Sequence, residues 1–78
     1  MRTLTAYLKT SERDEGKVFE AFLKSIAKAD TIHVSYMPRV AVWFRFDTDS
    51  DPESLERISR EHGFKVDVFD TEHEEKAS

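Results

Sequence analysis

The sequence of 78 residues contains no cysteine, which excludes disulfide bonds, thiolate nucleophiles and cysteine-based zinc sites. Glycine and proline are scarce, with 2 of each, and no apolar run approaches the roughly 18 residues that a membrane-spanning helix needs. The first residues also lack the apolar core and small-residue cleavage site of a secretory signal. We therefore expect a cytoplasmic protein without a membrane role.

Positive charge is scarce in the second half of the chain. Residues 1–46 carry 8 basic and 5 acidic side chains (+3), whereas residues 47–78 carry 4 basic and 11 acidic ones (−7), which together give the net charge of −4. Nonspecific binders of duplex DNA need a basic surface. The charge therefore disfavours that function and is typical of an acidic, self-repelling surface.

Alternating apolar and polar residues predict four strands, each with one face toward a core. In residues 40–46, for example, Val42 and Phe44 point to one side, and Trp43 points to the other. The residues expected to point inward are Leu4, Ala6, Leu8, Ile32, Val34, Tyr36, Val40, Val42, Phe44, Phe46, Phe64, Val66 and Val68. The predicted strands cover residues 3–9, 31–37, 39–47 and 64–70.

Two helices are expected between these strands. The first follows Ser11 or begins nearer Asp14, and Gly16 is an unfavourable residue within it. Its apolar stripe combines Val18, Phe19, Phe22, Leu23 and Ile26. The second has Asp51 as its N-cap, Pro52 at the first helical position and Gly63 at its end. Its apolar face is thin, chiefly Leu55 and Ile58, and Glu56 and Arg60 form an i,i+4 pair.

The hairpin between the second and third strands must keep apolar partners on one face. Because cross-strand partners share a face, the loop must contain an odd number of residues. A loop centred on Pro38 satisfies this condition. It pairs Val34 with Val42, Ile32 with Phe44, and His33 with Trp43.

The resulting order, β-α-β-β-α-β, predicts an α+β, ferredoxin-like split βαββαβ fold. We expect a four-stranded antiparallel sheet in the order 4-1-3-2, with both helices on one face because the crossovers are right-handed. Residues 1–70 form this single domain, and residues 71–78 are expected to be an acidic mobile tail.

The sheet face without helices receives the aromatic side chains left over from the core. They come from three neighbouring strands and form an apolar patch of the kind that marks interaction sites. Basic or titratable side chains lie on the same face. The predicted partner-binding residues are Tyr7, Lys9, His33, Trp43, Arg45 and Phe69.

No motif for chemistry accompanies this face. Asp47, Asp49 and Asp51 begin like a calcium loop, but Pro52 stands where the loop needs glycine and Ile58 where it needs glutamate. The three histidines lack ligand-like spacing, and there is no phosphate-binding glycine loop and no nucleophile elbow. We therefore expect no enzyme, no metal site and no cofactor.

Two short segments resemble the RNA recognition motif family. The segment "AYLKT" (6–10) is similar to its first-strand element, with Tyr7 at the stacking position. The segment "RVAVWFRF" (39–46) is similar to its third-strand element through Arg39, Trp43 and Phe46, while Val40 replaces the glycine and Ala41 the second stacking aromatic. The resemblance implies single-stranded RNA bound by stacking on the open sheet face.

Three functions follow from these observations. The first is a small interaction domain that binds a protein partner, or a second copy as a homodimer, through the open face. The second is single-stranded RNA or DNA binding by the same aromatic side chains. The third is an acidic inhibitor of a nucleic-acid enzyme, of the kind mobile elements use, whose second half occupies a basic groove.

Overall fold

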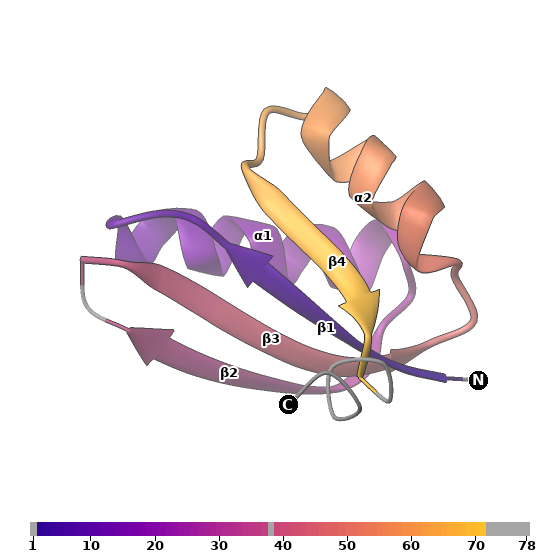
Figure 1. Ribbon diagram of the computed structural model, residues 1–78. Helices are drawn as coiled ribbons and strands as arrows, with labels where there is room; N and C mark the ends of the chain where they lie inside the picture. The colour runs from indigo at the N-terminus through magenta and orange to yellow at the C-terminus, as the bar shows by residue number, and fades with distance from the viewer. Residues whose placement is uncertain (1, 38, 72–78) are drawn as a thin grey trace.

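A computed structural model describes residues 2–37 and 39–71 of the protein (Figure 1). The expected element order is confirmed. The elements are β1 (Arg2–Leu8), α1 (Arg13–Ile26), β2 (Asp30–Met37), β3 (Ala41–Thr48), α2 (Pro52–Glu61) and β4 (Val66–Asp70). Most of the predicted tail, residues 72–78, lies outside the described residues.

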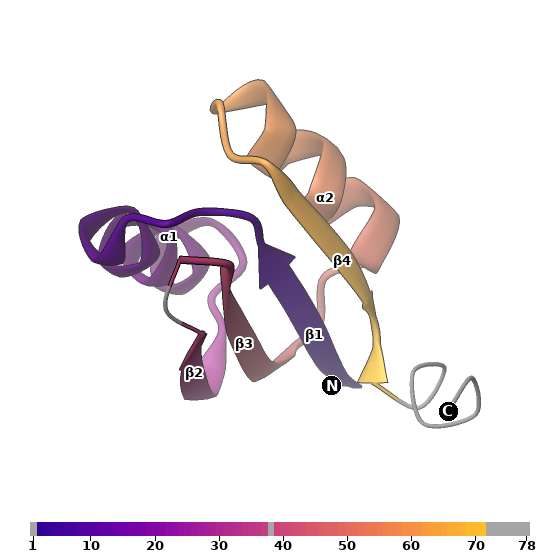
Figure 2. The same ribbon diagram turned by 60° about the vertical axis from the view of Figure 1, so that its left-hand side comes forward.

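The four strands form one antiparallel sheet in the order β2-β3-β1-β4, which is the predicted order counted from the other edge. Both helices lie on one side of the sheet, α1 over β3 and beside β2, and α2 along β4 (Figures 1 and 2). The fold is therefore the α+β, ferredoxin-like arrangement that the strand and helix patterns predict. No helix in the described part of the chain is long and apolar enough to cross a membrane.

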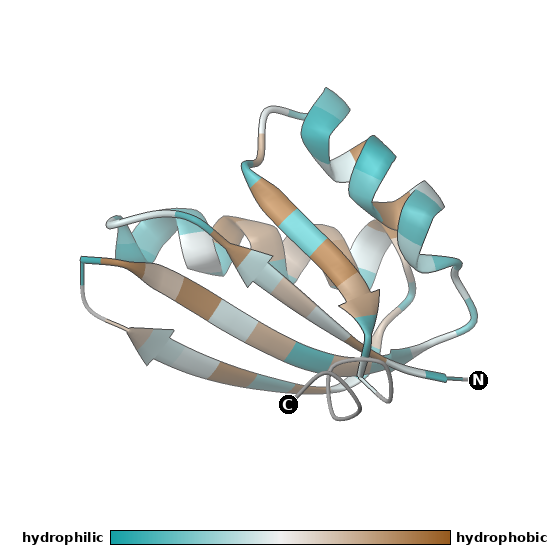
Figure 3. Cartoon of the chain, in the orientation of Figure 1, coloured by the Kyte–Doolittle hydropathy of each residue, from teal (hydrophilic) through white to brown (hydrophobic). Residues whose placement is uncertain are grey.

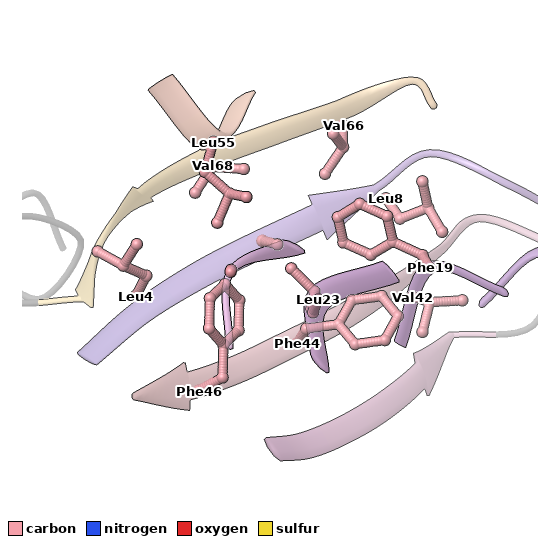
Figure 4. Packing of buried hydrophobic residues seen from close by; sticks show 12 residues of the cluster. Leu4, Leu8, Phe19, Leu23, Val42, Phe44, Phe46, Leu55, Val66 and Val68 are labelled. Atoms are coloured by element: carbon pink, nitrogen blue, oxygen red, sulfur yellow. The ribbon is translucent and has the colours of Figure 1, made fainter. Parts of the chain in front are cut away.

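The core lies between the helices and the three strands β3, β1 and β4. Along these strands, apolar residues alternate with polar ones (Figure 3). Phe19 of α1 packs edge-on against Phe44, with ring centroids 5.2 Å apart, and Leu55 of α2 fills the space over β4 (Figure 4). The strand β2 adds little to this core, because only Ile32 packs against it from that strand.

The first helix departs from the predicted stripe. Its buried residues are Gly16, Phe19 and Leu23, whereas Val18 and Ile26 are exposed. Phe22 is only partly buried and packs at the edge of the core. The stripe is narrow because α1 and α2 lie over different parts of the sheet and leave the outer sides of α1 uncovered (Figure 2).

Gly16 has low helix propensity, but it allows α1 to pack closely against β3. A Cβ atom built on it would lie 3.3 Å from Val42 Cγ2, closer than ordinary van der Waals contact. The missing side chain lets the start of α1 approach the sheet. Ser11 does not cap this helix, since the N-cap is Glu12, which makes no side-chain capping hydrogen bond.

The second helix follows its predicted signals more closely. Asp51 Oδ2 accepts a hydrogen bond from the Ser54 amide at 3.1 Å, with Pro52 at the first helical position. Gly63 follows the helix with a φ of 91°, in the left-handed region that favours glycine. Together, these signals fix both ends of α2 beside β4.

The hairpin between β2 and β3 has the predicted parity but a different length. Val34 pairs with Phe44 and Ser35 with Trp43, so the predicted pairing of Val34 with Val42 is wrong by two residues. The Val40 amide donates to the Met37 carbonyl at 3.1 Å across a turn in which Arg39 has a φ of 67°. This turn displaces Val40 from the predicted core face, and it is 52% exposed.

Candidate interaction surface on the open sheet face

Three aromatic rings gather on the sheet face opposite α1 and α2, the open face, which lies toward the viewer in Figure 1. Tyr7 of β1 pairs directly with Trp43 of β3, and their ring centroids are 4.5 Å apart. Phe69 of β4 meets Trp43 edge-on at 6.4 Å. We call Tyr7, Trp43 and Phe69 the aromatic cluster. The three strands that the sequence predicts to contribute aromatics therefore bring them together.

Alternation within β3 explains why Trp43 stands there. Val42 and Phe44 are buried in the core, so the residue between them must point to the other side. Trp43 is partly exposed, and its Nε1 donates a hydrogen bond to Met37 Sδ at 3.1 Å. The indole is thus held in place by β2 on one side and Tyr7 on the other.

A depression adjoins Trp43 on the same face, and Thr5 and Ser35 are among the residues that line it. Arg45 and His33 line it; they are opposite each other in the β2–β3 register, and both are exposed. The Arg45 guanidinium makes no ion pair with any other described residue. The depression therefore offers an aromatic side chain beside a positive charge that is not ion-paired with any described residue.

Lys9 differs from Arg45 in this respect. Its Nζ lies 3.4 Å from Asp67 Oδ2, and Asp67 also accepts from Arg60 Nη2 at 2.8 Å. Lys9 follows β1 with the same strand parity as Tyr7, and its charge is balanced by Asp67. Of the predicted cationic residues, Arg45 is thus the better candidate for contact with a partner.

Near the end of β4, two threonine side chains on the open face are buried against each other. Thr5 and Thr71 are both buried, and their hydroxyl oxygens lie 2.8 Å apart in a hydrogen bond. Thr71, which the sequence pattern places in the tail, packs on the sheet instead. Thr71 is two residues after Phe69, so continued strand alternation would have predicted that it lies on the same face.

No group of three His, Asp or Glu side chains within residues 2–37 and 39–71 is arranged to hold a metal ion. The oxygen of Asp47, from the calcium-like segment, instead accepts the Thr3 hydroxyl at 2.6 Å.

Comparison with protein families, with curated proteins and with solved structures finds no match to this chain.

Proposed function

We propose that this protein is a non-enzymatic interaction domain that binds a protein partner through the open sheet face. The carrying observation is the aromatic cluster, which draws on three strands and lies on the sheet face opposite α1 and α2. Tyrosine, tryptophan and arginine are the residue types that dominate binding energy at protein interfaces. A cytoplasmic location, inferred from the absence of cysteine, is part of the same proposal.

The neighbouring depression narrows the chemistry of the partner. Trp43 provides apolar surface there, and Arg45 provides a charge that is not ion-paired with any described carboxylate. A partner segment with an apolar side chain next to a carboxylate satisfies both features. Lys9 adds less, because Asp67 already neutralises it.

The test compares immobilised wild-type protein with Arg45→Ser, and uses Arg57→Ser as the matched control. Both arginines are exposed, but Arg57 lies on α2, away from the open face. We expect a partner retained by the wild type and by the control to be lost or weakened at least about tenfold with Arg45→Ser. Equal retention by all three proteins would show that the open face is not the binding surface.

Single-stranded nucleic acid is a second candidate, and the direct pairing of Tyr7 with Trp43 beside Arg45 favours it. Stacked bases contribute about 1–3 kcal/mol each in such sites. A titration of the protein with oligonucleotides at low salt, monitored by Trp43 fluorescence, distinguishes the two. Quenching that weakens with added salt supports nucleic acid, and unchanged fluorescence excludes it. The inhibitor interpretation, which rests on the acidic second half, stays a prediction.

A further inference from the structure

One hydrogen bond and the three strand registers determine in which direction the backbone N–H and C=O groups of the edge strands β4 and β2 point. The Lys9 amide donates to the Lys65 carbonyl at 2.8 Å. In an antiparallel ladder, residues alternate between bonding one neighbour and facing the other. The alternate residues of β4, Val66 and Val68, therefore direct their backbone groups away from β1.

The same alternation can be followed across the sheet. The odd-numbered residues of β1 bond β4, so its even-numbered residues, such as Ala6, bond Phe44 and its neighbours in β3. Trp43 then bonds Ser35 of β2. The backbone N–H and C=O groups of Val34 and Tyr36 consequently point out of the sheet at its β2 edge.

At the β4 edge, side chains of α2 satisfy the outward groups. Glu56 Oε1 accepts from the Val68 amide at 2.8 Å, and Arg60 Nε donates to the Val66 carbonyl at 3.2 Å. At the β2 edge, no described side chain hydrogen-bonds to Val34 or Tyr36. An uncapped edge of this kind is a template for another strand.

The side chains of β2 also favour pairing. Val34 is 46% exposed, Tyr36 36% and Met37 45%, so this edge strand exposes three large apolar side chains. Proteins usually protect an exposed edge strand with lysines, prolines or short length. Within its 8 residues, β2 contains no lysine, arginine or proline, and Asp30 is its only carboxylate.

We propose that a second copy of this chain pairs through β2, antiparallel to the first, to form one continuous sheet. A twofold axis at Ser35 places Val34 opposite Tyr36 of the second copy, and Tyr36 opposite Val34. Both pairs join outward-directed backbone groups, and they bring an aliphatic side chain against an aromatic one.

Charge favours a second copy as the occupant of this edge. Asp30, at the beginning of β2, is next to Asp47 in the β2–β3 pairing, and Arg39 lies just beyond the other end of β2. Antiparallel pairing brings the acidic end of one strand toward Arg39 of the other copy, and this happens twice by symmetry. This interface is separate from the open face, and it leaves both aromatic clusters on the same side of the joined sheet.

Sedimentation equilibrium tests the proposal with Val34→Lys and the matched control Val18→Lys. Val18 is 58% exposed on α1, so the control adds the same charge to an exposed valine away from the β2 edge. We expect the wild type and the control to have twice the mass of the 9.1 kDa chain, and Val34→Lys to have the mass of one chain. Circular dichroism checks that both variants are folded.

Amide hydrogen exchange gives a measurement that needs no variant. In a paired edge, the amides of Val34 and Tyr36 are protected from exchange, and they lose this protection on dilution as the dimer dissociates.

A wild-type monomer at all accessible concentrations would overturn the proposal, as would a Val34→Lys protein that stays dimeric. If Arg45→Ser rather than Val34→Lys dissociates the dimer, the second copy binds at the open face instead. If Arg45→Ser only abolishes partner capture, the two surfaces are independent.

Discussion

At one edge of the sheet, α2 places Glu56 and Arg60 on the backbone of β4, whereas at the other edge no side chain in the described part of the chain hydrogen-bonds to the backbone of Val34 or Tyr36 in β2. Both edges belong to the same small domain. The difference arises because α2 runs along β4 and anchors there through the buried Leu55, while α1 packs mainly over the core side of β3 (Figure 1).

This comparison shows that polar residues can determine the properties of a sheet edge as strongly as apolar ones do. The apolar face of α2 is thin, with Leu55 buried and Ile58 only partly so. Its hydrophilic residues, which dominate α2 in Figure 3, supply the hydrogen bonds that close β4. A helix that is weakly anchored by apolar contacts can therefore still protect an edge strand.

Removal of the anchor of α2 should have the largest effect. Leu55 is 2% exposed, and Leu→Ala substitutions at buried sites cost about 2–5 kcal/mol. We expect Leu55→Ala to lower the free energy of unfolding by that amount and to free the β4 edge. A denaturant melt at low protein concentration measures it. A loss below about 1 kcal/mol would show that α2 is held chiefly by its polar contacts.

Proline substitution distinguishes the amides of β2 that bond to β3 from the amides that point away from the sheet. Ser35→Pro removes a donor that bonds β3 and leaves a carbonyl without its partner, at a cost of about 1–3 kcal/mol. Val34→Pro removes only an outward amide, so we expect its cost to be clearly smaller. Thermal melts of the two variants under monomeric conditions test this assignment. Equal destabilisation would mean that the alternation across the sheet is assigned incorrectly.

Opening the capped edge should have an intermediate effect. Glu56→Ala removes the acceptor of the Val68 amide, and the loss of such a bond costs about 1–2 kcal/mol. Glu56→Gln keeps an acceptor oxygen and should retain most of this stability. Amide exchange at Val68 should accelerate in the alanine variant and much less in the glutamine variant. The same rate in both would show that Glu56 does not cap the strand.

The smallest effect is expected at the uncapped edge. Val34 is 46% exposed, and exposed substitutions usually change stability by less than about 0.5 kcal/mol. Val34→Thr keeps the β-branched shape that suits a strand, so its melt under monomeric conditions should match the wild type. A marked destabilisation would indicate that β2 contributes more to the core than its burial shows.

The sequence allowed a correct assignment of the strand faces but not of the details at their ends. Alternation requires Trp43 to point opposite to Val42 and Phe44, and the same rule places Tyr7 and Phe69 beside it. The hairpin length was wrong because parity permits loops of one or three residues. The chain uses the turn from Met37 to Val40, which is sterically easier than the tighter loop.

Other features depend on contacts between distant segments, which periodicity does not record. The i,i+4 pair of Glu56 and Arg60 is present at 3.8 Å, but both side chains also bind β4. Likewise, Gly16 is costly in an isolated helix and useful only because Val42 lies under it. In the candidate site, the ion pair that neutralises Lys9 could not be read from spacing, because Asp67 belongs to a strand far along the chain.

The cap that α2 places on β4 also sets the size of the assembly. A sheet with two open edges can add copies at both ends, and head-to-tail addition that does not close produces filaments. In the dimer that we propose, the capped edge does not accept a strand, so growth through β2 stops after one twofold contact. On this proposal Glu56 and Arg60 prevent polymerisation at the β4 edge, and their loss would convert a closed pair into a species able to aggregate edge to edge.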